Sequence, residues 1–221
     1  MTHRGPPFRF ARIGRIVASL EICVFLAGIS VAQGAIVRVL DYNIHRGFGG
    51  TDSNSGAQPA LAKIVNYLRP DIWTLNEVGG NSAGFNSAGA RADIIEFVTS
   101  RLTIFGSNPR EGIDYFVYVA ALHDGFSTNA IVSRYPFLTT QTFSDAGGGF
   151  GALRGLASGF VDLPGEFDVG VFTAHLKALS STTDAERRQA EANANAANIV
   201  NWMSGHAGAA TLLSGDWNET E

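Results

Sequence analysis

Residues 212–219, LLSGDWNE, place two polar side chains directly after an apolar run. The leucine pair at 212–213 predicts the end of a buried strand, and Gly215 predicts a bend. Asp216 and Asn218 are two residues apart, so in extended geometry their side chains face the same side. Such an Asp can orient an attacking water, and such an Asn can hold a phosphate oxygen or a metal-bound water. The alternative is an ordinary Asx turn after a strand.

The same arrangement, a polar side chain at the end of an apolar run, occurs three more times along the chain. Asn43 lies near the end of IVRVLDYNI, Glu77 near the end of DIWTLNEV, and His175 directly follows GVFTA. Polar side chains gathered at strand ends are a common way for α/β-type scaffolds to present a site. We therefore expect these residues to lie together.

The rest of the chain alternates strands with helices at both ends and has a run of strands in the middle. This order favours an α+β fold with mixed sheets over a doubly wound parallel sheet. Helices are expected over 61–68, 94–102 and 183–203, the last with Arg187 and Arg188 on its exposed face. The expected strands are 36–44, 71–78, 115–122, 128–133, 137–143, 153–162, 168–174 and 210–215.

Glu77 follows a strand that carries Trp73, so its carboxylate is expected at the edge of the core. A glutamate rarely sits there without a partner. Mg²⁺ suits such a position, because it takes oxygen ligands and often only one or two protein carboxylates. The alternative partner is an arginine.

His175 at a strand end can donate a hydrogen bond to a phosphoryl oxygen as negative charge gathers there. The alternatives are a structural role for His175 and a turn-forming role for Asn43. Residues 147–151, GGGFG, are followed by no Lys-Ser/Thr pair and open no helix, so they predict a turn and no phosphate-binding loop. The sequence also has no G-x-S-x-G nucleophile elbow.

The first 32 residues differ from the rest of the chain. Four arginines precede the apolar run IVASLEICVFLAGISVA, and small residues follow it. This layout predicts a secretory signal peptide over 1–32, with a membrane anchor as the alternative, and hence an exported domain over 33–221. The only cysteine, Cys23, lies in this run, so removal of the segment excludes thiol chemistry and cysteine zinc sites.

Without residues 1–32 the chain carries 12 basic and 19 acidic residues, a formal charge of −7. No long basic run remains, although proteins that hold nucleic acid mainly through its phosphates normally show one. The charge balance therefore favours a small or locally held substrate.

Five stretches in this order resemble the endonuclease/exonuclease/phosphatase superfamily of metal-dependent phosphoesterases, which includes deoxyribonuclease-like and sphingomyelinase-like enzymes. They are LDYNIHRG (40–47), RPDIWTLNEV (69–78), STNAIVSRYPF (127–137), GVFTAHLKA (170–178) and LLSGDWNE (212–219). The resemblance covers about residues 36–219. It implies a four-layer sandwich, in which two mixed β-sheets pack face to face between helices, and phosphoester hydrolysis with Mg²⁺ or Mn²⁺.

The resemblance also implies a role for each strand-end residue. Glu77 matches the metal-binding glutamate, and Asn43 matches the asparagine that helps to order the metal site. His175 matches the histidine that contacts the scissile phosphate, Asp216 the aspartate that orients the nucleophilic water, and Asn218 its phosphate-site or metal-site partner. Asn76 and Trp217 depart from the usual glutamine and aliphatic or Phe residue, and neither change removes a ligand.

The family pattern continues into further strands and a Ser-Asp-His motif that this sequence does not contain. The resemblance therefore predicts that the domain is incomplete at its C-terminus, with its last strands missing, and that the chain is poorly stable and weakly active.

The function expected from these observations is an exported phosphodiesterase or nuclease, in which a metal-site water attacks in line. Its substrate would be a nucleic acid, a lipid headgroup or a small phosphodiester; we expect a monomer with no protein partner. A phosphomonoesterase or lipid-headgroup phosphodiesterase is the alternative within the class. A non-catalytic remnant or binding protein is the alternative outside it.

Overall fold

The structure is a computed structural model that describes residues 36–45, 48, 57–79, 85–165 and 167–218. The N-terminal segment with its expected signal peptide lies outside these residues. The helices are α2 (Ala57–Leu68), α3 (Ser87–Arg101) and α4 (Thr182–Gly205). The strands are β1 (Val39–Asn43), β2 (Ile72–Val78), β3 (Phe116–Val119), β4 (Thr128–Ser133), β5 (Phe137–Phe143), β6 (Leu156–Val161), β7 (Val169–His175) and β8 (Ala210–Asp216).

Every helix and strand expected from the sequence is present, and the strands form two mixed sheets. One sheet has the order β1-β2-β4-β3 and the other the order β5-β6-β7-β8. Within each, a single pair is parallel: β1 with β2, and β7 with β8. Each parallel pair is connected through a helix, α2 or α4, because parallel neighbours need a crossover connection.

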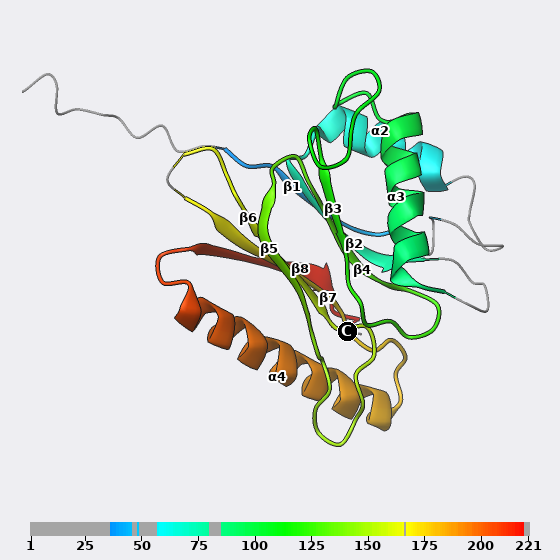
Figure 1. Ribbon diagram of the computed structural model, residues 1–221. Coiled ribbons are helices and arrows are strands. Elements are labelled where there is room, and N and C mark those ends of the chain that lie inside the picture. Colours follow the sequence, from blue (N-terminus) through cyan, green and yellow to red (C-terminus); the bar gives the residue numbers. More distant parts are fainter. Residues whose placement is uncertain (1–35, 46–47, 49–56, 80–84, 166, 219–221) are drawn as a thin grey trace, which may run out of the picture. The chain divides into compact units, whose positions relative to one another are not determined.

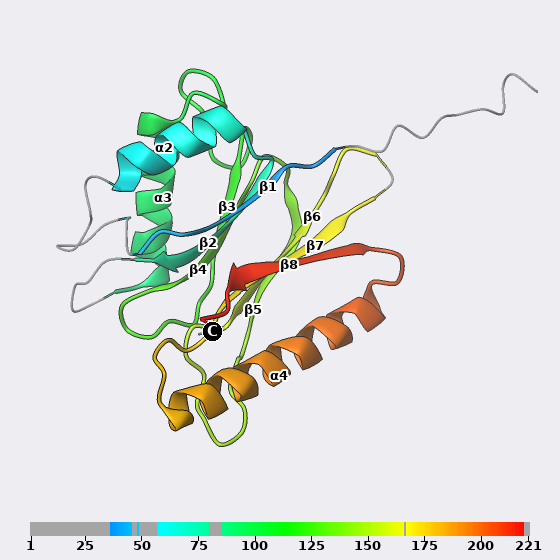
Figure 2. The ribbon, with the colours of Figure 1, turned by 180° about the vertical axis from the view of Figure 1, so that it is seen from behind.

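The two sheets pack against each other, and helices cover their outer faces (Figures 1 and 2). Helices α2 and α3 pack on the first sheet, through a core that includes Val65, Ile94 and Trp73. Helix α4 packs on the second sheet through Ile199 and Trp202. A separate apolar cluster lies between the sheets. The expected four-layer α+β sandwich is confirmed.

Strand β8 differs from its expectation. The leucine pair at 212–213 was expected to be buried, but Leu213 is 44% exposed. Strand β8 lies at the edge of its sheet and pairs only with β7 among the described strands. Leu213 is not among the residues that pack against the two core clusters of this sheet. Leu212, by contrast, packs against the cluster between the sheets.

The first turns of α4 also differ from their expectation. Arg188 was expected on an exposed face, but it is buried and donates hydrogen bonds to the backbone carbonyls of Lys177 and Leu179. Glu191, one turn later, is also buried; it accepts from Arg187 and from the backbone N–H of Lys177. This polar network fixes the loop that follows β7.

Among the helices that the structure describes, none is long and apolar enough to cross a bilayer.

Gly170 leaves room for a side chain of α4 to pack directly on the sheet. A Cβ atom built at this position would lie 2.4 Å from the indole of Trp202. We expect Gly170→Ala to lower the free energy of unfolding by about 1–3 kcal/mol through overpacking, measured by urea denaturation. Gly151→Ala is the matched control, because a Cβ atom there meets nothing within 4 Å. Equal stability of the two variants would contradict this packing.

Candidate functional site

The parallel strand pairs bring the strand-end residues together. In the first sheet Asn43 is the register partner of Asn76, and Glu77 comes next along β2. In the second sheet His175 is the register partner of Asp216. The carboxyl ends of two parallel strands meet at one edge, so each sheet presents two polar side chains at the same level. Contacts across the sandwich then join the two pairs.

Asn43 connects the two sheets through a single amide nitrogen. Its Nδ2 donates to Glu77 Oε1 at 3.1 Å and to Asp216 Oδ2 at 2.8 Å. His175 approaches the same two carboxylates, with its Nε2 3.7 Å from Glu77 Oε1 and 4.0 Å from Asp216 Oδ2. Four of the five residues singled out in the sequence therefore meet at one point.

Asn218, the fifth residue, lies beside this point, with its amide group directed at the backbone. Its Nδ2 donates to the carbonyl of Leu176 at 2.8 Å, and its backbone N–H donates to Asp216 Oδ1 at 3.0 Å. The Asx turn considered for the sequence is therefore present. It fixes the Asp216 carboxylate and leaves no direct contact between Asn218 and Glu77 or His175 among the interactions of the described residues.

Glu77 has an unusual backbone conformation. Its φ is +55°, and the pairing of β2 with β4 shifts register between Leu75 and Val78, which marks a bulge. Successive residues of a regular strand face opposite sides, whereas a bulge re-aims a side chain. The bulge thus allows Glu77 to reach the inter-sheet site although its neighbour Asn76 also faces it. A left-handed conformation costs a non-glycine residue about 1–2 kcal/mol.

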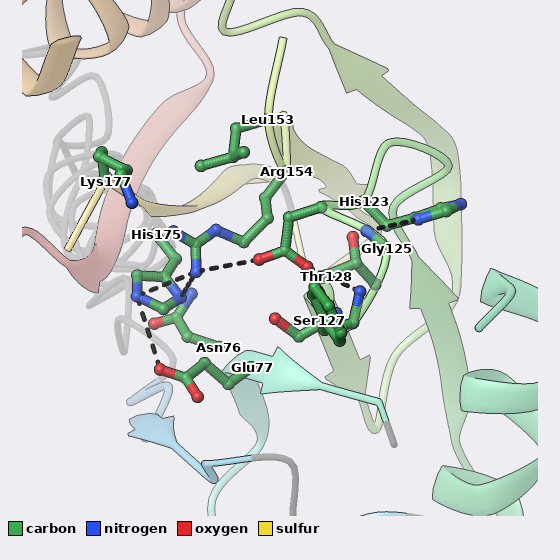
Figure 3. Close-up of polar contacts among 12 residues, drawn as sticks. Asn76, Glu77, His123, Gly125, Ser127, Thr128, Leu153, Arg154, His175 and Lys177 are labelled. Atoms are coloured by element: carbon green, nitrogen blue, oxygen red, sulfur yellow. Dashed lines mark hydrogen bonds and ion pairs between the residues drawn. The ribbon is translucent and has the colours of Figure 1, made fainter. Parts of the chain in front are cut away.

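Two further site residues, Arg154 and Asp124, were not expected from the sequence. Arg154 is buried, with Nη1 2.9 Å from His175 Nδ1 and 3.3 Å from its Nε2 (Figure 3). The lone pairs of an imidazole diverge in its plane, so one atom this close to both nitrogens lies over the ring. Asp124 Oδ2 is 3.7 Å from the same Nη1. The sequences around Arg154 and Asp124 contain no motif that predicts a site. Only its burial distinguishes Arg154 from a surface arginine.

His45, assigned no role from the sequence, also contacts the site. Its backbone N–H donates to Asn43 Oδ1 at 2.9 Å, and its exposed ring places Nδ1 3.3 Å from Glu77 Oε2. Both carboxylate oxygens of Glu77 therefore have polar neighbours: Asn43 and His175 at Oε1, and His45 at Oε2.

The surroundings keep His175 neutral and Asp216 ionised. Burial, followed by the positive charge of Arg154, lowers the pKa of His175 to about 4, although the nearby carboxylates oppose the shift. Burial raises the pKa of Asp216, but the hydrogen bonds from Asn43 and from the backbone of Asn218 outweigh it, so this pKa lies below its usual value. At neutral pH the site combines an anionic acceptor with an uncharged imidazole.

An open pocket of about 580 Å³ adjoins these residues. Its lining residues are Asp41, Asn43, Asn76, Gly215, Asp216, Trp217 and Asn218. Among the described residues, no group of three or more His, Cys, Asp or Glu side chains forms a metal cage. Mg²⁺ does not need one, since it usually binds through one or two carboxylates and keeps several waters. Two carboxylates that converge on one amide therefore fit a hydrated divalent ion.

The pKa of His175 predicts how stability depends on pH. The unfolded chain, with a histidine pKa near 6.5, binds more protons than the folded chain between pH 6.5 and about 4. The stabilisation is therefore complete above pH 6.5 and is lost as the pH falls toward 4. At pH 5 we expect a loss on the order of 2 kcal/mol from this residue. Urea unfolding in chelator-treated buffer at pH 7 and pH 5 measures it.

His175→Gln provides the control for the pH experiment, because its side chain does not titrate. The variant should be less stable at pH 7 but should lose less stability than the wild type between pH 7 and pH 5. An identical pH dependence in both proteins would show that the imidazole is not held neutral.

The strain at Glu77 predicts a trade-off between stability and function. Glu77→Gly removes both the left-handed penalty and a carboxylate that lies close to Asp216. In metal-free buffer we expect the variant to be more stable than the wild type by about 1 kcal/mol, measured by urea denaturation. Val78→Gly, at the adjacent residue without a positive φ, should be destabilising. A loss of stability in Glu77→Gly would refute the strain argument.

The family model that matches residues 42–220 is described as the Endonuclease/Exonuclease/phosphatase family. A comparison of the sequence with curated proteins finds no match.

Solved structures with a similar fold include a truncated TDP2 from Caenorhabditis elegans. It shares 20% identity at a TM-score of 0.59, and the match covers 83% of this chain and 63% of that one. The mannosyl-6-phosphatase of Bacteroides thetaiotaomicron shares 17% identity at a TM-score of 0.59, with 84% and 67% covered. TDP2 of D. rerio, solved with a single-strand DNA product, shares 17% identity at a TM-score of 0.53, and the match covers 84% of this chain and 62% of that one.

The match spans less than two thirds of the three C. elegans TDP2 chains, at 63%, 54% and 56% of their lengths. At these identities the likeness concerns the fold.

Proposed function

Since this chain belongs to the Endonuclease/Exonuclease/phosphatase family, we propose that it is a divalent-metal-dependent phosphodiesterase or nuclease. One observation carries the proposal: the Asn43 amide nitrogen contacts both Glu77 and Asp216, and His175 faces the same two carboxylates. An ion-pair network could also bring charged groups together. Here, however, the site opens into a pocket, and the ion pair that Arg154 makes among the described residues is with Asp124, not with Glu77 or Asp216.

Glu77 would provide the first carboxylate ligand of Mg²⁺ or Mn²⁺. Asn43 would act by orienting that carboxylate, because its own oxygen is already bound by the backbone N–H of His45. The bound ion would polarise a phosphoryl oxygen and neutralise the charge that develops on it. The bulge at Glu77 and the amide of Asn43 supply the positioning that such a ligand needs.

Asp216 would hold the attacking water. Its Oδ1 accepts from the backbone of Asn218 and its Oδ2 accepts from Asn43, so the carboxylate plane is fixed by two donors. Because its pKa is low, the group stays an acceptor at neutral pH and can receive a hydrogen bond from water. Fixing the direction of that acceptor aligns the water before it attacks.

His175 and Arg154 would stabilise the charge on the phosphoryl group. A buried neutral imidazole can donate a hydrogen bond without carrying a desolvated charge of its own. The guanidinium over the ring supplies the positive charge, and Asp124 holds it in place. Asn218 would contribute by anchoring the loop of Asp216.

The substrate that we propose is a small or locally held phosphodiester. The acidic balance of residues 33–221 and the carboxylates that line the pocket disfavour a long polyanion held by its phosphates alone. We also propose that the protein is exported, on the strength of the N-terminal arginines and apolar run, and that it acts as a monomer.

Turnover of a generic diester tests this function. With bis(p-nitrophenyl) phosphate and Mg²⁺, the full chain should show hydrolysis that a chelator abolishes. Glu77→Ala and Asp216→Asn should each lower kcat by about 100-fold or more. Glu186→Gln, a change to an exposed carboxylate on α4, should leave the rate unchanged.

Three results would count against the proposal. Equal rates in Glu77→Ala and the wild type would remove the metal assignment. Faster hydrolysis of p-nitrophenyl phosphate than of the diester would favour a phosphomonoesterase instead. A folded wild-type chain that binds Mg²⁺ but turns over neither ester would favour a binding protein.

A further inference from the structure

Asn76 carries a buried acceptor that no group in the described part of the protein satisfies. The side chain is fully buried, yet its Oδ1 has no hydrogen-bond partner among the described residues. Its Nδ2 is well supplied, donating to Asn129 Oδ1 at 2.9 Å, Thr173 Oγ1 at 3.1 Å and the carbonyl of Ala174 at 3.2 Å. An unsatisfied buried acceptor costs about 1–3 kcal/mol, so it requires an explanation.

The orientation of the Asn76 amide follows from two backbone carbonyls. Asn129 donates through its Nδ2 to the carbonyl of Gly155 at 2.8 Å, so its Oδ1 must face Asn76. Asn76 in turn must direct its Nδ2 at the carbonyl of Ala174, which can only accept. Exchanging the oxygen and nitrogen of Asn76 would set oxygen against oxygen at two contacts. The free atom is therefore the oxygen.

This oxygen belongs to the site that we have described. Asn76 lines the same pocket as Asn43 and Asp216, and it is the register partner of Asn43 in the adjacent parallel strand. Figure 3 shows its side chain between those of His175 and Glu77. A partner for Oδ1 would therefore lie close to the two carboxylates.

The partner of Asn76 Oδ1 has to be a hydrogen-bond donor. The amide groups that line the pocket are already engaged, because Asn43 Nδ2 donates to the carboxylates and Asn218 Nδ2 donates to a backbone carbonyl. The acidic lining residues, Asp41 and Asp216, can only accept. A phosphodiester oxygen is excluded as the partner, because a diester carries no proton at neutral pH and can only accept. The site calls for a positively charged, donor-rich occupant.

A hydrated divalent cation meets this requirement. Its bound waters donate hydrogen bonds, and its charge balances the carboxylates. A water held about 2 Å from Mg²⁺ and hydrogen-bonded to an acceptor at about 2.8 Å places that acceptor roughly 4–5 Å from the ion. An acceptor on the strand next to Asn43, and next in sequence to Glu77, is suited to such an outer-sphere position.

We propose that Asn76 is a positioning residue of the metal site, whose Oδ1 accepts a hydrogen bond from a water on the divalent ion. The inference rests on the proposed function, since it assumes an ion at Glu77. In this chain the asparagine has two tasks. Its amide nitrogen joins β2 to β4 and β7, and its oxygen orients one water of the hydration shell.

The test uses the wild-type full chain, because any substitution of Asn76 also removes its three donated hydrogen bonds. In a ¹³C,¹⁵N-labelled sample we would titrate Mg²⁺ and follow the side-chain ¹³Cγ of Asn76 and ¹³Cδ of Glu77 by NMR. We expect the Asn76 signal to shift downfield and to saturate at the same Mg²⁺ concentration as that of Glu77. Asn129 is the internal control, because it lies in the same buried network but its side-chain oxygen and nitrogen are both hydrogen-bonded. Its signal should not shift.

The possible outcomes separate this inference from the function on which it rests. A shift of Glu77 without a shift of Asn76 would overturn the role of Asn76 and leave the metal site intact. No shift at either residue would overturn the metal dependence, and the inference with it. In Glu77→Ala, which leaves every hydrogen bond of Asn76 in place, the Mg²⁺-dependent shift of Asn76 should disappear; its persistence would also contradict the proposal.

Discussion

The site depends on a hydrogen-bond arrangement in which one amide nitrogen serves two carboxylates. Asn43 lies at the end of β1 and donates to Glu77 in its own sheet and to Asp216 in the opposite sheet. Two carboxylates this close together repel each other unless donors or cations lie between them. Asn43 supplies the donor, and the buried Arg154 supplies charge from the other side of His175. Together they offset the repulsion between the two carboxylates, so both remain available to the divalent ion that we propose.

The surrounding structure is organised to keep these groups in position at some cost in stability. Glu77 adopts a left-handed backbone conformation at a bulge, and the buried oxygen of Asn76 has no hydrogen-bond partner among the described residues. Strain and unsatisfied groups of this kind concentrate at functional sites. Other parts of the described chain also carry such features, including positive φ values at Arg69 and Leu179 and a buried Tyr115 hydroxyl without a hydrogen-bond partner among the described residues. What sets this edge of the sandwich apart is that both features lie beside two carboxylates that share one amide donor.

The sequence predicted the fold and the proximity of most of the candidate site residues because both depend on short patterns. Apolar runs that end in Asn43, Glu77, His175 and Asp216 identify strand ends, and parallel pairing of such strands brings their ends together. Burial was predicted wrongly for Leu213, because an apolar run does not reveal which of its side chains other elements cover. Arg154 and Arg188 were missed for a related reason. Arginine is usually exposed, and only the packing of distant loops shows that these two are buried.

The account is tested most directly by the affinity for Mn²⁺ in the full chain with and without the Asn43 amide. Electron paramagnetic resonance distinguishes free from bound Mn²⁺, so it reports binding independently of catalysis. If Asn43 orients the Glu77 and Asp216 carboxylates, Asn43→Ala should weaken Mn²⁺ binding by about 10- to 100-fold, the usual cost of losing an outer-shell partner. An unchanged affinity in a folded variant would contradict the account, because the carboxylates would then bind the ion without the amide that connects them.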